Sequence, residues 1–210
     1  MMGKGIPGVD RRRWLRDCSL LAAAFGASGL SAAQGGREAR TLLIVGDSLS
    51  AEYGLPRGSG WVALLTQRIE RERLPWRVVN ASISGDTTSG GRARLPALLQ
   101  QHRPAAVVIE LGGNDALRGL PLASTEANLV AMTRAAKAAG ARVLLVGMQV
   151  PPNYGRQYTQ DFERLFARAA QAEKVALVPF LLAGVADGPD PVALFQPDRI
   201  HPKAEAQPRM

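Results

Sequence analysis

The sequence predicts an α/β fold in which helices cover both faces of a parallel sheet. Beyond residue 40, strand-like and helix-like blocks alternate along the chain, and such alternation is typical of βαβ units. The strand-like blocks are short and rich in valine, isoleucine and leucine, as expected of strands that are buried on both faces. Neither a repeat nor a low-complexity linker interrupts this pattern, so we expect a single domain there.

Nine elements are expected from the hydrophobic pattern and the turn residues. Strands are predicted near 41–46, 76–81, 105–111, 142–148 and 175–178, and helices near 59–73, 92–101, 124–139 and 157–173. The third helical block contains good helix formers and ends at Gly140, which suits a helix C-cap. Prolines at 151 and 152 and the stretch 184–197 predict loops.

The composition indicates a globular protein. Of its 210 residues, 46% are hydrophobic and 21% are charged, which argues against disorder and against a protein with several membrane spans. The net charge of +8 falls to about +5 outside residues 1–33, where 21 basic and 16 acidic residues remain. These basic residues are scattered and not interleaved with aromatic residues, so nucleic-acid binding is not expected.

Residues 1–33 are predicted to be an export signal. A basic stretch precedes a modestly apolar segment over 18–30, and small residues follow up to Ala33. The arginine-rich run at 11–16 favours the twin-arginine type, with a general secretion signal or an uncleaved start as alternatives. The apolar segment is too short for stable membrane insertion. We therefore expect cleavage near Ala33 and a periplasmic or secreted protein, without Cys18, the chain's single cysteine.

Four polar segments are expected at one edge of the sheet, three after predicted strands and one near the end of the chain. These segments are Gly46–Ser50, Ser84–Asp86, Gly112–Asp115 and Asp198–His201. The loops that follow the carboxyl ends of parallel strands form the ligand site in open α/β sheets. We therefore expect the four segments to converge on one site.

Ser48 is a candidate nucleophile. A serine at this place is often only a helix N-cap, and a catalytic role requires a base. His201 is the candidate base, since Asp198, three residues before it, can fix its tautomer. His102 stands at the end of a predicted helix, where the helix dipole favours a histidine, so a structural role is expected.

Two further residues can donate hydrogen bonds to a developing oxyanion. The N–H of Gly85 can approach a ligand closely because glycine has no side chain, although a simple turn is the alternative. Asn114 carries an amide donor, although it is also a common turn former. Asp115 and Glu110 are expected to be structural. The absence of a His/Cys cluster and the dispersed carboxylates argue against a metal site.

Taken together, these motifs resemble the SGNH (GDSL) hydrolase superfamily, and within it the periplasmic thioesterase I, arylesterase and lysophospholipase group. The resemblance is carried by LLIVGDSLS at 42–50, VNASISGDT at 79–87, ARLPALLQQ at 93–101, ELGGND at 110–115, VPPNYG at 150–155 and DRIHPKAEAQP at 198–208. It implies that residues 34–210 form a three-layer, flavodoxin-like α/β/α sandwich with a five-stranded parallel sheet. The implied activity is hydrolysis of esters and thioesters through an acyl-enzyme, without a cofactor.

The resemblance also implies roles for residues. Ser48 would be the nucleophile, His201 the base and then the acid, and Asp198 the residue that orients it. Gly85, Asn114 and the Ser48 amide would form the oxyanion hole. The expected acyl groove would be lined by Leu111, Met148, Val150, Pro151 and Tyr154. The expected partner is a small acyl ester or thioester, bound by a monomer.

Two positions depart from the family pattern. Glu52 stands where many relatives have glycine, and a carboxylate there is expected to repel anionic thioesters or to change the flexibility of the loop. Residues 204–210 are expected to form only a short C-terminal helix, where the family continues further. Three alternatives therefore stay open at this point: a carbohydrate O-deacetylase on the same scaffold, an inactive truncated homologue, and a binding module in which Ser48 caps a helix against an anion.

Overall fold

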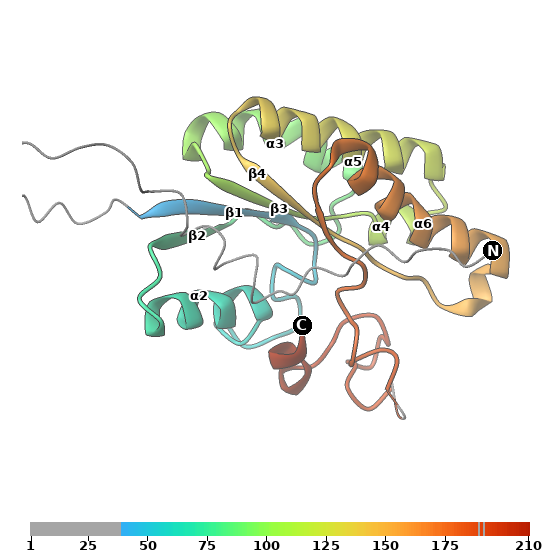
Figure 1. The fold of residues 1–210 in the computed structure, drawn as a ribbon. Helices are drawn as coiled ribbons and strands as arrows, with labels where there is room; N and C mark the ends of the chain where they lie inside the picture. Colours follow the sequence, from blue (N-terminus) through green and yellow to red (C-terminus); the bar gives the residue numbers. More distant parts are fainter. Residues whose placement is uncertain (1–38, 189, 191) are drawn as a thin grey trace, which may run out of the picture.

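The computed structural model describes residues 39–188, 190 and 192–210, and these form an α/β/α sandwich (Figure 1). Its five strands make one parallel sheet in the order β2-β1-β3-β4-β5. They are β1 (Arg40–Gly46), β2 (Trp76–Asn80), β3 (Ala106–Glu110), β4 (Arg142–Val146) and β5 (Ala176–Val178). The predicted fold class and all five predicted strands are confirmed. The predicted export signal lies outside the described residues.

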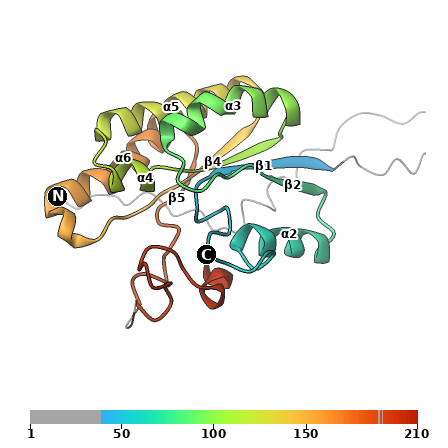
Figure 2. The same cartoon turned by 180° about the vertical axis from the view of Figure 1, so that it is seen from behind.

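The helices divide into two layers. They are α2 (Trp61–Arg71), α3 (Thr88–His102), α4 (Gly113–Leu117), α5 (Leu122–Ala138), α6 (Arg156–Glu173), and the 3₁₀ helices η2 (Pro152–Tyr154) and η3 (Ala204–Arg209). Figures 1 and 2 show α3, α5 and α6 on one face of the sheet, with α2 and η3 on the other. Within the described part of the chain, no helix has the length and apolarity that crossing a membrane requires.

The core explains why the strands consist of uninterrupted hydrophobic runs. The side chains of Leu43, Ile44 and Val45 on β1 are all 0% exposed, although they point alternately to opposite faces. Both directions are apolar because a helical layer covers each face. Each aliphatic side chain buried in this way contributes roughly 1.5–3 kcal/mol to stability.

Contacts distant in sequence decide where α3 begins. The prediction placed its start near residue 92, but the helix begins at Thr88, after Thr87, whose side chain accepts a hydrogen bond from the N–H of Gly90. The buried carboxylate of Asp115 accepts hydrogen bonds from the N–H and the hydroxyl of Thr88. The structural role expected for Asp115 is thus to fix the start of this helix. Just after the end of α5, Gly140 adopts a φ of 84°, as its predicted capping role requires.

The C-terminal segment packs against the start of α2. It forms the 3₁₀ helix η3, in which Ala206 and Gln207 are buried. Gln207 Oε1 accepts a hydrogen bond of 3.0 Å from the N–H of Trp61, the first residue of α2. The segment just after His201 is thereby attached to the helical layer below the sheet.

Candidate active site

The four polar segments converge where the sequence predicted. The chain leaves β1 for β2 on one side and reaches β3 on the other, so the sheet changes direction of winding beside β1. In α/β sheets the crevice at such a point is the usual ligand site. Ser48 follows β1 here, while Asn114 lies on α4, just after β3. The loop with Asp198 and His201 joins them from the far end of the chain.

Ser48, His201 and Asp198 form one continuous hydrogen-bonded chain. Ser48 Oγ lies 2.8 Å from His201 Nε2, and His201 Nδ1 lies 2.7 Å from Asp198 Oδ2. With the Nδ1 proton donated to the carboxylate, Nε2 is left to accept the serine proton. The ring of Tyr53 lies against the imidazole, with 4.4 Å between ring centroids. This arrangement can activate a serine hydroxyl.

The loop that carries His201 is held by its own backbone. Arg199 adopts a left-handed φ of 58°, and Asp198 Oδ1 accepts hydrogen bonds from the N–H groups of Ile200 and His201 at 2.9 and 3.0 Å. The N–H of Gln196 donates to the carbonyl of His201 at 2.7 Å and closes the loop. Burial opposes ionisation of Asp198, but these N–H groups and the imidazole together hold the pKa of its carboxyl below the ordinary value. Asp198 is therefore held as an anion against the imidazole of His201.

Three N–H donors are available near Ser48. In the described part of the chain, neither the backbone N–H of Ser48 nor that of Gly85 has a hydrogen-bond partner. Gly85 has a φ of 78°, a conformation that glycine adopts without strain. Asn114 Nδ2 donates one proton to Asp47 Oδ2 at 3.0 Å, which leaves its second proton free for a ligand. These are the donors that an oxyanion hole needs.

Asp47 is a site residue that the sequence analysis missed. Its carboxylate is 3% exposed and accepts hydrogen bonds from the Asn114 amide and from the N–H of Leu49. Burial raises the pKa of this carboxyl to about 6, although the two hydrogen bonds act in the opposite direction. The position of Asp47, beside the candidate nucleophile and directly after a buried strand, was the available signal. In the structure Asp47 holds the Asn114 side chain in place.

Glu110 supports the nucleophile loop from below. Its Oε2 accepts a hydrogen bond of 2.7 Å from Ser50 Oγ and one of 3.3 Å from the N–H of Asp47. A Cβ atom at Gly46 would lie only 2.7 Å from this oxygen, so the close approach requires glycine. Complete burial, together with the nearby charge of Asp47, raises the pKa of Glu110 well above its ordinary value. This supporting position agrees with the structural role expected from the sequence.

The raised pKa of Glu110 predicts a pH-dependent loss of stability. Between its ordinary pKa of 4.5 and the raised value, the folded chain holds a proton that the unfolded chain has released. The free energy of unfolding therefore decreases with rising pH, by about 1.4 kcal/mol per pH unit from this group. Glu110→Gln keeps an acceptor for Ser50 and removes the titration. We expect urea unfolding of this variant to show a flatter decrease in stability between pH 5 and pH 7 than the parent chain shows.

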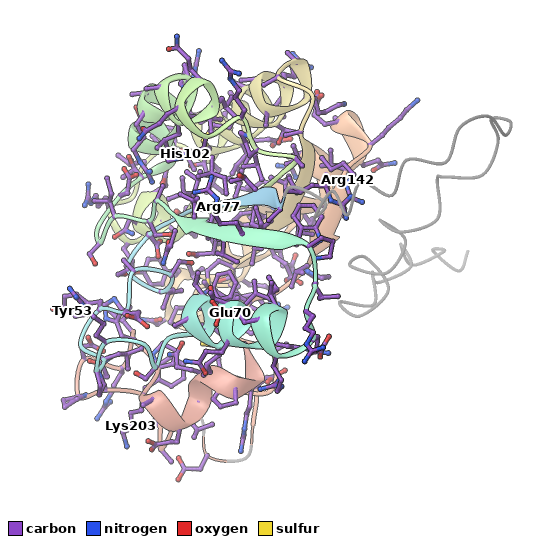
Figure 3. All side chains as sticks on the ribbon, turned by 90° about the vertical axis from the view of Figure 1, so that its left-hand side faces the viewer. Tyr53, Glu70, Arg77, His102, Arg142 and Lys203 are labelled. Atoms are coloured by element: carbon purple, nitrogen blue, oxygen red, sulfur yellow. The ribbon has the colours of Figure 1, made fainter. Side chains whose placement is uncertain are left out.

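Glu70→Gln is the matched control for this measurement, because Glu70 is exposed on α2 (Figure 3). Its pH profile should run parallel to that of the unmodified chain. If the Glu110→Gln profile is also parallel, the buried carboxyl is not the source of the pH dependence.

An apolar cavity of about 870 Å³ opens beside Ser48 and His201. Four of the five predicted groove residues line it, namely Met148, Val150, Pro151 and Tyr154. The prediction for Leu111 was wrong. Its side chain is 1% exposed and packs between α3 and α5, against Gly91 and Met132. The apolar lining residues that the sequence analysis missed are Leu49, Tyr53, Leu117, Phe180, Leu182, Ala186, Val192, Phe195 and Ile200.

The rim of this cavity carries most of the exposed large apolar side chains of the described residues. Seven such side chains are exposed, and five of them line the cavity: Tyr53, Leu117, Tyr154, Val192 and Ile200. Figure 3 shows Tyr53 at the edge of the molecule, on the opposite side from Arg142 at the start of β4. The apolar surface is thus concentrated at the carboxyl end of the sheet.

The Glu52 side chain makes its hydrogen bonds within its own loop and does not line the cavity. Its carboxylate accepts hydrogen bonds from the N–H groups of Gly58 and Gly60, at 3.0 and 2.8 Å, just before α2. Glu52 is not among the residues that line the cavity. The side chain is turned into its own loop, which it ties together by these hydrogen bonds, and the expected repulsion of anionic substrates stays a prediction. In the described ranges, moreover, no cluster of three or more histidine, cysteine or carboxylate side chains could hold a metal ion.

Comparison with known proteins gives the family. The model of the GDSL-like lipase/acylhydrolase family matches residues 44–208. The chain belongs to this family. It is 55% identical over 172 residues to the esterase TesA of Pseudomonas aeruginosa, covering 82% of this chain and 84% of that one. It is 46% identical to the thioesterase 1/protease 1/lysophospholipase L1 of Escherichia coli K12, over 81% of this chain and 79% of that one.

A solved structure supports the same assignment. The psychrotrophic esterase EstA from Pseudoalteromonas sp., inhibited by monoethylphosphonate, superimposes with a TM-score of 0.76 at 41% identity. The alignment covers 81% of this chain and 91% of that one. The resemblance found in the sequence and the expectation of an ester-hydrolysing enzyme are thereby confirmed.

Proposed function

We propose that the chain is an exported hydrolase of carboxylic esters and thioesters that works through an acyl-enzyme on Ser48. The observation that carries the proposal is the chain of short contacts from Ser48 through His201 to Asp198 at the mouth of an apolar cavity. A nucleophile, a base and an orienting carboxylate in this order are what acyl transfer requires. The names of the relatives, esterase and thioesterase 1/lysophospholipase L1, favour the same reaction.

The reaction begins with attack of Ser48 Oγ on the acyl carbonyl carbon, while His201 Nε2 takes the hydroxyl proton. The carbonyl oxygen becomes an oxyanion, which the N–H groups of Ser48 and Gly85 and the free amide proton of Asn114 stabilise. Asp198 stabilises the imidazolium that has formed. His201 then protonates the departing alcohol or thiol, and the acyl group stays on Ser48.

Water then hydrolyses the acyl-enzyme, with water as the nucleophile and Ser48 Oγ as the leaving group. His201 Nε2 removes a proton from water, which attacks the acyl-enzyme and passes through a second oxyanion. Collapse of this intermediate releases the carboxylic acid and returns the proton to Ser48. The acyl chain lies in the apolar cavity, whose volume of about 870 Å³ suits an extended aliphatic group. Neither step uses a cofactor.

The predicted signal over residues 1–33 supports a periplasmic or secreted location for the mature enzyme. We propose cleavage near Ala33, which leaves the cavity and the triad intact on residues 34–210. N-terminal sequencing of the exported protein would locate the cleavage site.

Covalent labelling tests the proposed chemistry directly. A fluorophosphonate should attach to the full chain at one site, and peptide mapping should place the adduct on Ser48. The same preparation should release 4-nitrophenol from 4-nitrophenyl butyrate and free thiol from an acyl-coenzyme A. If acetate is instead released faster from acetylated xylan than acids are from either of these, the O-deacetylase alternative is correct. A chain that neither reacts with the label nor hydrolyses any ester would overturn the proposal.

A further inference from the structure

Five non-glycine residues in the described part of the chain have a positive φ, a conformation that side chains rarely adopt. Three of them, Arg73, Arg103 and Lys174, lie where helices end, and left-handed residues are common at helix ends. Glu52 uses its position to bind two backbone N–H groups with its carboxylate. Arg199 remains, and neither a helix end nor a side-chain contact accounts for it.

The positive φ of Arg199 is required by the turn of this loop, but the turn does not require the side chain to be an arginine. Its φ of 58° allows the following N–H groups to reach Asp198, and glycine would allow the same turn with less strain. The Arg199 side chain is exposed and lines the cavity. Among the described residues its guanidinium has no hydrogen-bond or ion-pair partner. The side chain is therefore free to bind something that enters the cavity.

The carboxylates that line the cavity accept hydrogen bonds from residues other than Arg199. Asp47 binds the Asn114 amide, and Asp187 Oδ1 accepts a hydrogen bond from the N–H of Gly184. Asp198, next to Arg199 in the sequence, binds the imidazole of His201. The positive charge of Arg199 is thus available to a ligand.

We propose that Arg199 is an anion-binding subsite at the mouth of the cavity, which receives the phosphate of an anionic leaving group. The inference rests on the proposed function, in which His201 protonates the departing alcohol or thiol. That group must therefore lie on the His201 side of the scissile bond, and Arg199 is two residues away on the same loop. A guanidinium binds phosphate oxygens through two parallel N–H donors, and it is charged at every working pH. The acyl half then occupies the apolar part of the cavity.

The test compares substrates that share one acyl group and differ in the charge of the leaving group. Octanoyl-coenzyme A and the octanoyl thioester of N-acetylcysteamine have the same reacting bond, but only the first carries phosphate. For Arg199→Gln we expect kcat/KM for octanoyl-coenzyme A to fall about tenfold, the size expected of one charge-assisted contact. The neutral thioester should change by less than about twofold. Arg199→Lys should recover part of the loss, because it keeps the charge.

Arg103→Gln is the matched control, since Arg103 also has a positive φ but lies at the end of α3 and does not line the cavity. It should leave the ratio of the two rates unchanged. A third substrate, octanoyl lysophosphatidylglycerol, identifies the source of the phosphate. A loss with coenzyme A alone assigns a nucleotide phosphate, a loss with lysophospholipid alone assigns a lipid headgroup, and a loss with both assigns shared phosphate recognition.

The outcomes separate this inference from the proposed function. If the unmodified chain hydrolyses none of the three substrates, the proposed function itself fails. If it hydrolyses the neutral thioester and Arg199→Gln leaves all ratios unchanged, the proposed function stands and the subsite is wrong. An equal loss on charged and neutral substrates would also overturn the subsite, because it would mean that Arg199 only holds the loop of His201.

Discussion

Ser48→Ala is expected to lower kcat for 4-nitrophenyl butyrate by about 10⁴-fold or more, because the variant lacks the oxygen that forms the acyl-enzyme. The fold should survive, since among the described residues the Ser48 hydroxyl is hydrogen-bonded only to His201 Nε2 and its loss leaves no buried partner unsatisfied. KM should change little because the cavity keeps its lining. Steady-state kinetics and the loss of fluorophosphonate labelling would measure the effect.

Ser50→Ala is the control for this substitution. Ser50 is buried two residues further along and donates to Glu110 Oε2, so its loss should lower stability by about 1–2 kcal/mol without preventing labelling. Labelling that persists in Ser48→Ala and disappears in Ser50→Ala would mean that Ser50 is the nucleophile and that the mechanism given for Ser48 is wrong.

The sheet could be predicted because each buried strand is an uninterrupted apolar run that local sequence displays, such as Leu42–Val45. The start of α3 could not be predicted in the same way. Two glycines at 90 and 91 argue against a helix locally, whereas the Thr87 cap and the distant carboxylate of Asp115 impose one. Tertiary contacts of this kind have no signal in a local window.

In the candidate site, too, some features could be predicted from the local sequence and others depend on tertiary contacts. Motif residues such as Ser48 and His201 were identified because their chemistry depends on residue type. Leu111 was misplaced because neighbouring residues at the end of a strand point to opposite faces, and the sequence does not say which face carries the cavity. Glu110 points to the nucleophile loop, so Leu111 points away from it, into the core. The contact between Asp47 and Asn114 joins residues 67 positions apart, and only the folded chain displays it.

His201→Ala is expected to reduce kcat about as much as Ser48→Ala, by about 10⁴-fold, because an unassisted serine hydroxyl is a weak nucleophile near neutral pH. His102→Ala is the matched control with the same change of side chain. His102 ends α3, and Figure 3 shows it well apart from Tyr53, whose ring lies against His201. This variant should keep its full rate.

The double variant Ser48→Ala/His201→Ala decides whether the two residues act as a unit. The imidazole has no proton to take once the hydroxyl is gone, so removing both should cost no more than removing either one. Independent contributions would instead multiply, giving a loss of about 10⁸-fold. A multiplied loss, measured against the same ester, would mean that His201 works without Ser48. The 2.8 Å contact between them would then have to serve binding, and the proton would need another route.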